Sequence, residues 1–161
     1  MRKGLLGVIV LLTCFFCDRA NAMAPVREHL VYEDFTVSAH CSFDVLFHIV
    51  QNNVVLTTLF DKDGNIERQI AHGVLKVQLV NTIAPEKNLL LNISGGAEFT
   101  TRPDGSFVTV GQGPWLNFGL ANLPGVLLYS HGRFQAVVTP NGEYLLTEFP
   151  NDGINVCGLI A

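Results

Sequence analysis

The sequence predicts an all-β fold, an antiparallel up-and-down β-barrel of about eight to ten strands, and three observations support this. Apolar and polar residues alternate with a period of two in several segments, among them 43–50, 75–79 and 133–138. Turns that end in Asp-Gly or Asn-Gly separate many of these segments. After residue 22, no stretch sustains the apolar spacing of an amphipathic helix.

Three turns share one pattern and predict three hairpins. They cover residues 61–64, 102–105 and 139–142, and each ends in Asp-Gly or Asn-Gly. Glycine adopts the positive φ that closes such turns without steric cost. In two of the turns, Pro103 and Pro140 supply the fixed φ that suits the first corner of a type I turn.

The predicted strands are short and lie close together along the chain. We expect them over residues 30–37, 43–50, 54–60, 66–80, 89–94, 97–101, 106–110, 115–118, 126–138, 143–149 and 154–157, with longer links over 83–88, 111–114 and 121–125. A meander of this length has two edges, and closure into a barrel removes both. A β-sandwich is the alternative architecture for the same pattern.

The first 22 residues have the layout of a secretory signal peptide. Arg2 and Lys3 precede an apolar run over residues 4–16, and Ala20-Asn21-Ala22 supplies the small-residue pattern of a cleavage site. A membrane-spanning helix needs about 20 apolar residues, which this run does not reach. We therefore expect a signal peptide over 1–22 and a single secreted domain over 23–161.

The cysteines predict one disulfide bond. Of the four in the sequence, Cys14 and Cys17 belong to the predicted signal peptide, which leaves Cys41 and Cys157 in the mature chain. A single pair of cysteines in a secreted domain is typical of a structural disulfide. Because these cysteines lie near the two ends of the domain, the bond would tie the first strands to the last.

The charge of the mature chain argues against a nucleic-acid partner. Removal of the first 22 residues leaves 139 residues with 7 Lys and Arg and 13 Asp and Glu, a net charge of −6. Nucleic acids need clustered cations, and no such cluster follows residue 22. No later segment is apolar enough to span a membrane as a helix. The oligomeric state is left open by the sequence.

Six aromatic residues are candidates for the wall of a ligand pocket, because a small barrel either fills with side chains or holds one small ligand. They are Phe99, Phe107, Trp115, Phe118, Tyr129 and Phe134. The favoured hypothesis is a non-enzymatic protein that binds a small apolar molecule. A cyclase or isomerase would instead need an inward polar cluster, for which Glu98, Glu148 or a histidine is a candidate. A protein acting through its outer face would need an exposed apolar patch.

The sequence predicts no catalytic residues, no cofactor and no metal site. Residues 61–67 resemble a calcium loop, but Gly64 follows only two oxygen-bearing side chains, so a plain hairpin is favoured. His48, His72 and His131 lack the spacing of zinc ligands. Asn92-Ile93-Ser94 is a glycosylation sequon, which matters only in a eukaryotic host.

Several of these motifs together resemble a family of small secreted bacterial proteins, typical of actinobacteria, that have no assigned function. The resemblance rests on Cys41-Ser42-Phe43, the turn Phe60-Asp61-Lys62-Asp63-Gly64-Asn65, Ser94-Gly95-Gly96, Gly132-Arg133 with Asn141-Gly142, and Cys157-Gly158-Leu159. It implies a β-barrel and no catalytic residues. A looser similarity to calycin-like and allene-oxide-cyclase-like barrels, which bind or cyclise apolar molecules, is one of fold alone.

Overall fold

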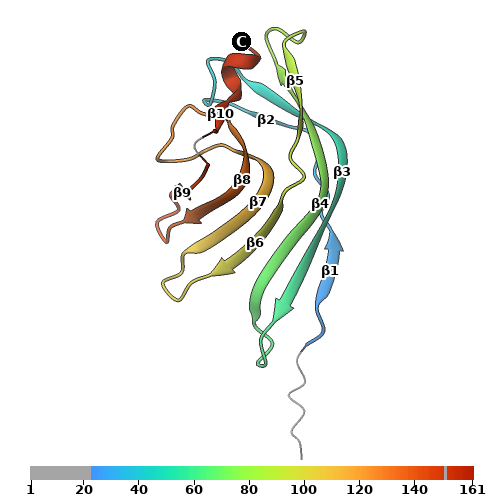
Figure 1. The fold of residues 1–161 in the computed structure, drawn as a ribbon, viewed down its shortest axis with the longest axis vertical. Coiled ribbons are helices and arrows are strands. Elements are labelled where there is room, and N and C mark those ends of the chain that lie inside the picture. Colours follow the sequence, from blue (N-terminus) through green and yellow to red (C-terminus); the bar gives the residue numbers. More distant parts are fainter. Residues whose placement is uncertain (1–22, 151) are drawn as a thin grey trace, which may run out of the picture.

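Ten antiparallel strands form one strongly curled sheet in the computed structural model, which describes residues 23–150 and 152–161 (Figure 1). The predicted signal peptide lies outside these residues. The elements are β1 (Val26–His29), β2 (Phe35–Val37), β3 (Val45–Phe60), β4 (Ile66–Asn81), β5 (Asn88–Asn92), β6 (Gly96–Thr101), β7 (Phe107–Asn117), β8 (Leu128–Val138), β9 (Tyr144–Glu148), β10 (Ile154–Asn155) and the 3₁₀ helix η1 (Val156–Leu159).

The three predicted hairpins are confirmed. The longest joins β3 and β4, and its turn is closed by the Gly64 amide, which donates to the Asp61 carbonyl over 3.2 Å. The equivalent bonds run from Gly105 to Arg102 between β6 and β7 and from Gly142 to Thr139 between β8 and β9. All three glycines have the positive φ that was predicted for the last residue of each turn.

Among the described strands, the two outer edges of the sheet are not hydrogen-bonded to each other. The strand order is β1-β3-β4-β6-β7-β8-β10, with β2 on β3, β5 on β4 and β9 on β8. One of these edges consists of β1 and β2, and the other of β9 and β10; β5, which pairs with β4 alone, leaves a further short edge. The antiparallel all-β fold is confirmed, but the predicted closure by strand pairing is not present among the described strands. The sheet is an open curl.

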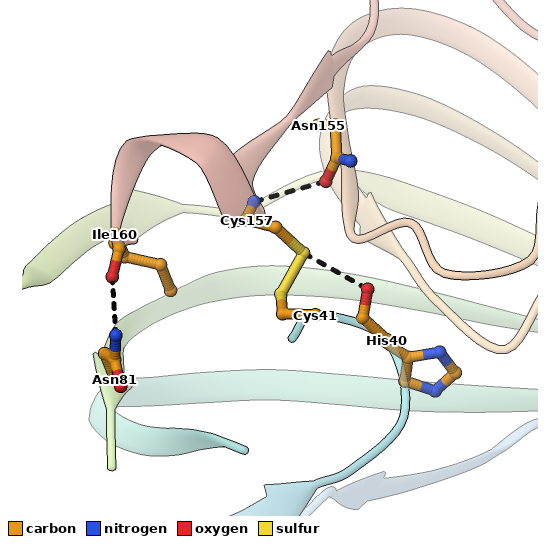
Figure 2. The surroundings of a disulfide bond; sticks show 6 residues. All are labelled: His40, Cys41, Asn81, Asn155, Cys157 and Ile160. Atoms are coloured by element: carbon orange, nitrogen blue, oxygen red, sulfur yellow. Dashed lines mark hydrogen bonds between the residues drawn. A yellow bond between two sulfur atoms is a disulfide. The ribbon is translucent and has the colours of Figure 1, made fainter. Parts of the chain in front are cut away.

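The disulfide bond predicted between Cys41 and Cys157 is present, and it connects the two edges (Figure 2). Cys41 lies between β2 and β3, whereas Cys157 lies in η1, directly after β10. The Asn155 side chain accepts a hydrogen bond from the Cys157 amide, and the Asn81 side chain donates to the Ile160 carbonyl over 3.0 Å. A covalent bond thus holds together edges that no strand pairing joins.

Two hydrophobic cores lie within the curl. The first joins the disulfide end of β3 and β4 to the C-terminal segment, and its buried members are Val45, Phe47, Val77, Leu79, Leu91, Leu127, Val156 and Ile160. The second packs one face of β7 and β8 against β9 and the link between β7 and β8, and its buried members are Trp115, Leu120, Leu128, Phe134, Ala136 and Leu146.

Several strand boundaries differ from those expected. Two strands were expected over 43–50 and 54–60, but residues 45–60 form the single strand β3, which contains a bulge between Ile49 and Gln51. The expected link over 111–114 lies inside β7, which stays paired with β8 along its whole length. Of the strand expected over 30–37, only residues 35–37 form a strand, β2, and residues 30–34 are a link; β1, over residues 26–29, was not predicted.

Candidate ligand cavity

A cavity of about 280 Å³ lies inside the curl of the sheet. Its wall draws on β3, β4, β6, β7, β8 and β9, on the link between β1 and β2, and on the link between β5 and β6. The lining residues are Tyr32, Val54, Ala71, Leu75, Ile93, Gly95, Gly96, Ala97, Phe99, Thr109, Pro114, Trp115, Leu116, Asn117, Phe134 and Tyr144. These are mostly apolar and aromatic side chains, which is typical of a small-molecule site.

A second cavity of about 200 Å³ adjoins the first. Both are lined by Tyr32, Leu75, Ile93 and Leu116. The second cavity also contacts the rings of Phe35, Phe47 and Phe118, whose centroids lie 4.7 to 6.2 Å apart. Tyr32 is 40% exposed, so it lies where the two cavities meet the surface.

The structure brings four of the six predicted aromatic residues to these cavities. Phe99, Trp115 and Phe134 line the first, and Phe118 lines the second. Phe107 and Tyr129 line neither cavity. Phe107 is 37% exposed and stacks on Phe99 with ring centroids 5.8 Å apart. The Tyr129 hydroxyl donates to the Asn92 carbonyl, and its ring packs beside the first core.

A glycine shapes one wall of the first cavity. Gly111 pairs with Phe134 across β7 and β8, and a Cβ at position 111 would lie 1.9 Å from the Phe134 ring. The ring therefore lies across the bare backbone of Gly111. From there it contacts Trp115 with centroids 4.6 Å apart. The absence of a side chain at position 111 thus fixes the position of both aromatic rings.

Five residues with polar side-chain groups line the first cavity, and three of them, Trp115, Asn117 and Tyr144, are considered in turn. The hydroxyl of the half-buried Tyr144 donates a hydrogen bond to Asn117 Oδ1, and partial burial raises the pKa of this tyrosine above its ordinary value of 10.0. Within the described residues, Trp115 Nε1 and Asn117 Nδ2 are buried and have no hydrogen-bond partner. Sequence analysis missed Asn117 and Tyr144. The spacing of Asn117 from Trp115, two residues along one strand, was the available signal.

The carboxylates considered for a cyclase or isomerase do not line the cavity. Glu98 lies 3.4 Å from the Arg68 guanidinium, and Glu148 lies 3.6 Å from that of Arg133. All four side chains are about half exposed. None of the residues that line the first cavity carries a charge. Its wall therefore offers hydroxyl, amide and indole groups, but no acid–base pair.

The three histidines considered as zinc ligands have different surroundings. His48 lies 2.7 Å from the Asp34 carboxylate, which lowers the pKa of that acid. His72 borders a surface groove beside His29, and His131 meets the Tyr129 ring edge-on. Among the described residues, no three His, Cys, Asp or Glu side chains gather in a way that could hold a metal ion.

The loop that resembles a calcium site and the glycosylation sequon both form local hydrogen bonds. The Asp61 carboxylate accepts hydrogen bonds from the Asp63 and Asn65 amides, so its oxygens are used in the hairpin turn. The Asn65 side-chain amide also donates to this carboxylate, and this bond, followed by those from the backbone amides, lowers the pKa of Asp61. Asn92 of the sequon is exposed at the end of β5, and the Ser94 hydroxyl bonds to both backbone polar groups of Leu75.

Comparison of the chain with protein-family models, with curated proteins and with solved structures found no match. In residues 23–150 and 152–161, no helix has the length and apolar character needed to cross a membrane.

Proposed function

We propose that this protein binds a small, predominantly apolar molecule in the first cavity and does so outside the cytoplasm. The observation that carries the proposal is the cavity of about 280 Å³, lined largely by apolar and aromatic side chains within the curl of the sheet. The adjoining second cavity extends the apolar wall toward Phe118. The disulfide supports an oxidising compartment, in which such bonds persist.

The residues of the cavity wall suit a binding protein better than they suit a cyclase or isomerase. Proton transfer during catalysis needs an acid or base within hydrogen-bond reach of the substrate. Glu98 and Glu148 form exposed ion pairs, and the cavity wall carries only hydroxyl, amide and indole groups. An interaction through the outer face is also less favoured. Its most exposed apolar side chains, Val31 and Ile83, belong to separate links, after β1 and after β4.

Titration with N-phenyl-1-naphthylamine, an uncharged apolar probe that fluoresces strongly out of water, tests the proposal. We expect saturable binding of one probe per chain, with energy transfer from Trp115, the single tryptophan. Ala97 lines the cavity, so Ala97→Leu should fill part of it and weaken probe binding about ten-fold.

The matched control is Glu98→Leu, which adds a leucine at the neighbouring, exposed position of β6. It removes only a surface ion pair, so probe affinity should be unchanged. If the probe does not bind, or if both variants bind it as the wild type does, the cavity is not the binding site.

A further inference from the structure

The two cavities inside the curl of the sheet share part of their walls. Tyr32, Leu75, Ile93 and Leu116 line both of them. These residues come from four separate segments, which are the link after β1, strand β4, the link after β5, and strand β7. The boundary between the cavities is therefore not a single strand or loop that passes between them.

None of the four shared residues is fully buried. Tyr32 is 40% exposed, and the other three are partly buried. By contrast, Phe47 and Val77 line the second cavity alone, and each is only 2% exposed. Side chains packed into a solid partition would lack accessible surface, as closely packed protein interiors do. The partial exposure of the shared residues indicates that the two cavities open into each other between these side chains.

The joined space is apolar along its length. Aromatic rings line the part of each cavity that is not shared. They are Phe99, Trp115 and Phe134 in the first cavity and Phe35, Phe47 and Phe118 in the second. Three of the four residues at the junction are aliphatic. Two apolar compartments that meet at a junction fit a flexible chain, whereas a rigid, compact molecule would occupy one compartment alone.

The volumes set the length of chain that needs both compartments. An apolar cavity of about 150 Å³ holds one benzene molecule, which corresponds to about 25 Å³ for each carbon atom. On this scale, a chain of about 10 carbon atoms fits the first cavity, whose volume is about 280 Å³. A chain of about 14 carbon atoms exceeds it and has to extend into the second cavity, which adds about 200 Å³.

The charges at the site favour an uncharged chain. No Asp, Glu, Lys, Arg or His lines either cavity. Tyr32, where the cavities meet the surface, is followed in the same link by Glu33 and Asp34, and the Asp34 carboxylate already contacts His48. An anionic head group would find no cation in the cavity walls and two carboxylates in the adjoining link, so its desolvation would be unfavourable.

From these observations we propose that the ligand is an uncharged, chain-shaped apolar molecule, such as a long-chain alcohol, that extends through both cavities and passes the junction beside Tyr32. The proposal rests on the proposed function and specifies the shape and charge of its ligand.

Three compounds test this proposal on the mature, oxidised protein: 1-decanol, 1-tetradecanol and tetradecanoate. Displacement of N-phenyl-1-naphthylamine measures their affinities. Each additional buried CH₂ group strengthens binding by up to about four-fold, so 1-tetradecanol should bind at least about ten-fold more tightly than 1-decanol. At pH 8, where tetradecanoate is ionised, it should bind at least about ten-fold more weakly than the alcohol of the same length.

A variant that fills only the second cavity separates a chain that spans both cavities from one that projects into water. Ile49 lines the second cavity alone and is partly buried. Ile49→Phe should weaken 1-tetradecanol at least about ten-fold and leave 1-decanol within about two-fold, because the shorter chain still fits the first cavity. The control is Val50→Phe, which adds the same ring at the next position, where the side chain is 48% exposed. It should change neither affinity.

Nuclear magnetic resonance of the wild type gives a readout that does not depend on a variant. Ala97 lines the first cavity alone, and Ile49 lines the second alone. At a stoichiometry of one 1-tetradecanol per chain, nuclear Overhauser effects should connect the ligand to the methyl groups of both residues. This measurement decides the proposal if Ile49→Phe does not fold.

The outcomes separate this inference from the proposed function. The inference alone is overturned if 1-tetradecanol contacts only one of the two methyl groups, if two molecules bind per chain, or if folded Ile49→Phe weakens both alcohols equally or neither. Tighter binding of tetradecanoate than of 1-tetradecanol also overturns it, and so does the failure of both alcohols to displace a probe that binds. If the naphthylamine probe and both alcohols fail to bind, the proposed function is overturned as well.

Discussion

Cys41 and Cys157 are 116 residues apart in the sequence, yet their Cα atoms lie 5.5 Å apart and their sulfur atoms connect the two edges of the sheet. In a closed barrel, a ladder of backbone hydrogen bonds makes this connection. Here one covalent bond makes it, supported by the Asn81 and Asn155 side chains on either side of η1. The cavity lies between walls that this bond keeps together.

Loss of the disulfide should destabilise the fold strongly. Cys41→Ser combined with Cys157→Ser should lower the free energy of unfolding by about 2–5 kcal/mol, because the bond closes a loop of more than 100 residues in the unfolded chain. Urea denaturation of the double variant measures this. The wild type unfolded in the presence of a reductant should give the same value, and an unchanged midpoint in both would show that the bond contributes nothing to stability.

Gly73 should not tolerate a side chain. It lies in the middle of β4 with a φ of 144°, and a Cβ there would lie 2.0 Å from the Asn53 carbonyl oxygen. Gly73→Ala should therefore destabilise the protein by at least about 1–3 kcal/mol, since rigid backbone has to shift. Gly96→Ala is the control, because its Cβ would meet only one atom, at 3.8 Å. Thermal unfolding should separate the two variants by several degrees.

Gly111→Ala should alter the cavity wall directly. The added Cβ would lie 1.9 Å from the Phe134 ring, which then has to leave its place beside Trp115. We expect a loss of stability of about 1–3 kcal/mol and a change in the tryptophan emission maximum. Gly158→Ala has open space around its Cβ and should change neither. Unaltered emission from Gly111→Ala would contradict the packing described for Phe134.

Tyr144 should make stability depend on pH in alkaline solution. Burial raises its pKa in the folded state above the ordinary value of 10.0, so the neutral form is favoured by folding. This contribution is fully present below pH 10 and is lost as the pH rises through the pKa of the folded protein. Urea midpoints measured from pH 8 upward should fall less steeply for Tyr144→Phe than for the wild type.

The same variant should be less stable than the wild type at pH 8, by about 1 kcal/mol, because Asn117 Oδ1 loses its donor. Tyr129→Phe serves as the control. Its hydroxyl donates to the Asn92 carbonyl at a more exposed site, so its effect at pH 8 should be smaller. Parallel pH profiles for wild type and Tyr144→Phe would contradict the burial of this hydroxyl.

The features that could be predicted from the sequence depend on local chemistry. Asp-Gly and Asn-Gly turns close hairpins wherever they separate alternating segments, so all three were found. The pairing of Cys41 with Cys157 followed from the count of cysteines left after the predicted signal peptide. Both inferences need only neighbouring residues or simple arithmetic.

The remaining features depend on how distant strands meet. Whether the two edges of the sheet pair depends on how strongly the sheet curls. The alternation of apolar and polar residues does not predict the degree of curling. Asn117 and Tyr144 come together because β7 and β9 both flank β8, and no spacing along the chain reveals this contact between them. The link expected over residues 111–114 was wrong because these residues, although they include two glycines and a proline, stay paired with β8.

The strand order also carries a consequence for the path of folding. Every paired strand in the sheet is joined to a partner next to it in the sequence or one strand removed, so the ladders grow from short loops. The disulfide between Cys41 and Cys157, and the first core around it, require the two ends of the domain to meet. The reduced chain should therefore acquire most of its strands first, and oxidation should trap a sheet that has already formed.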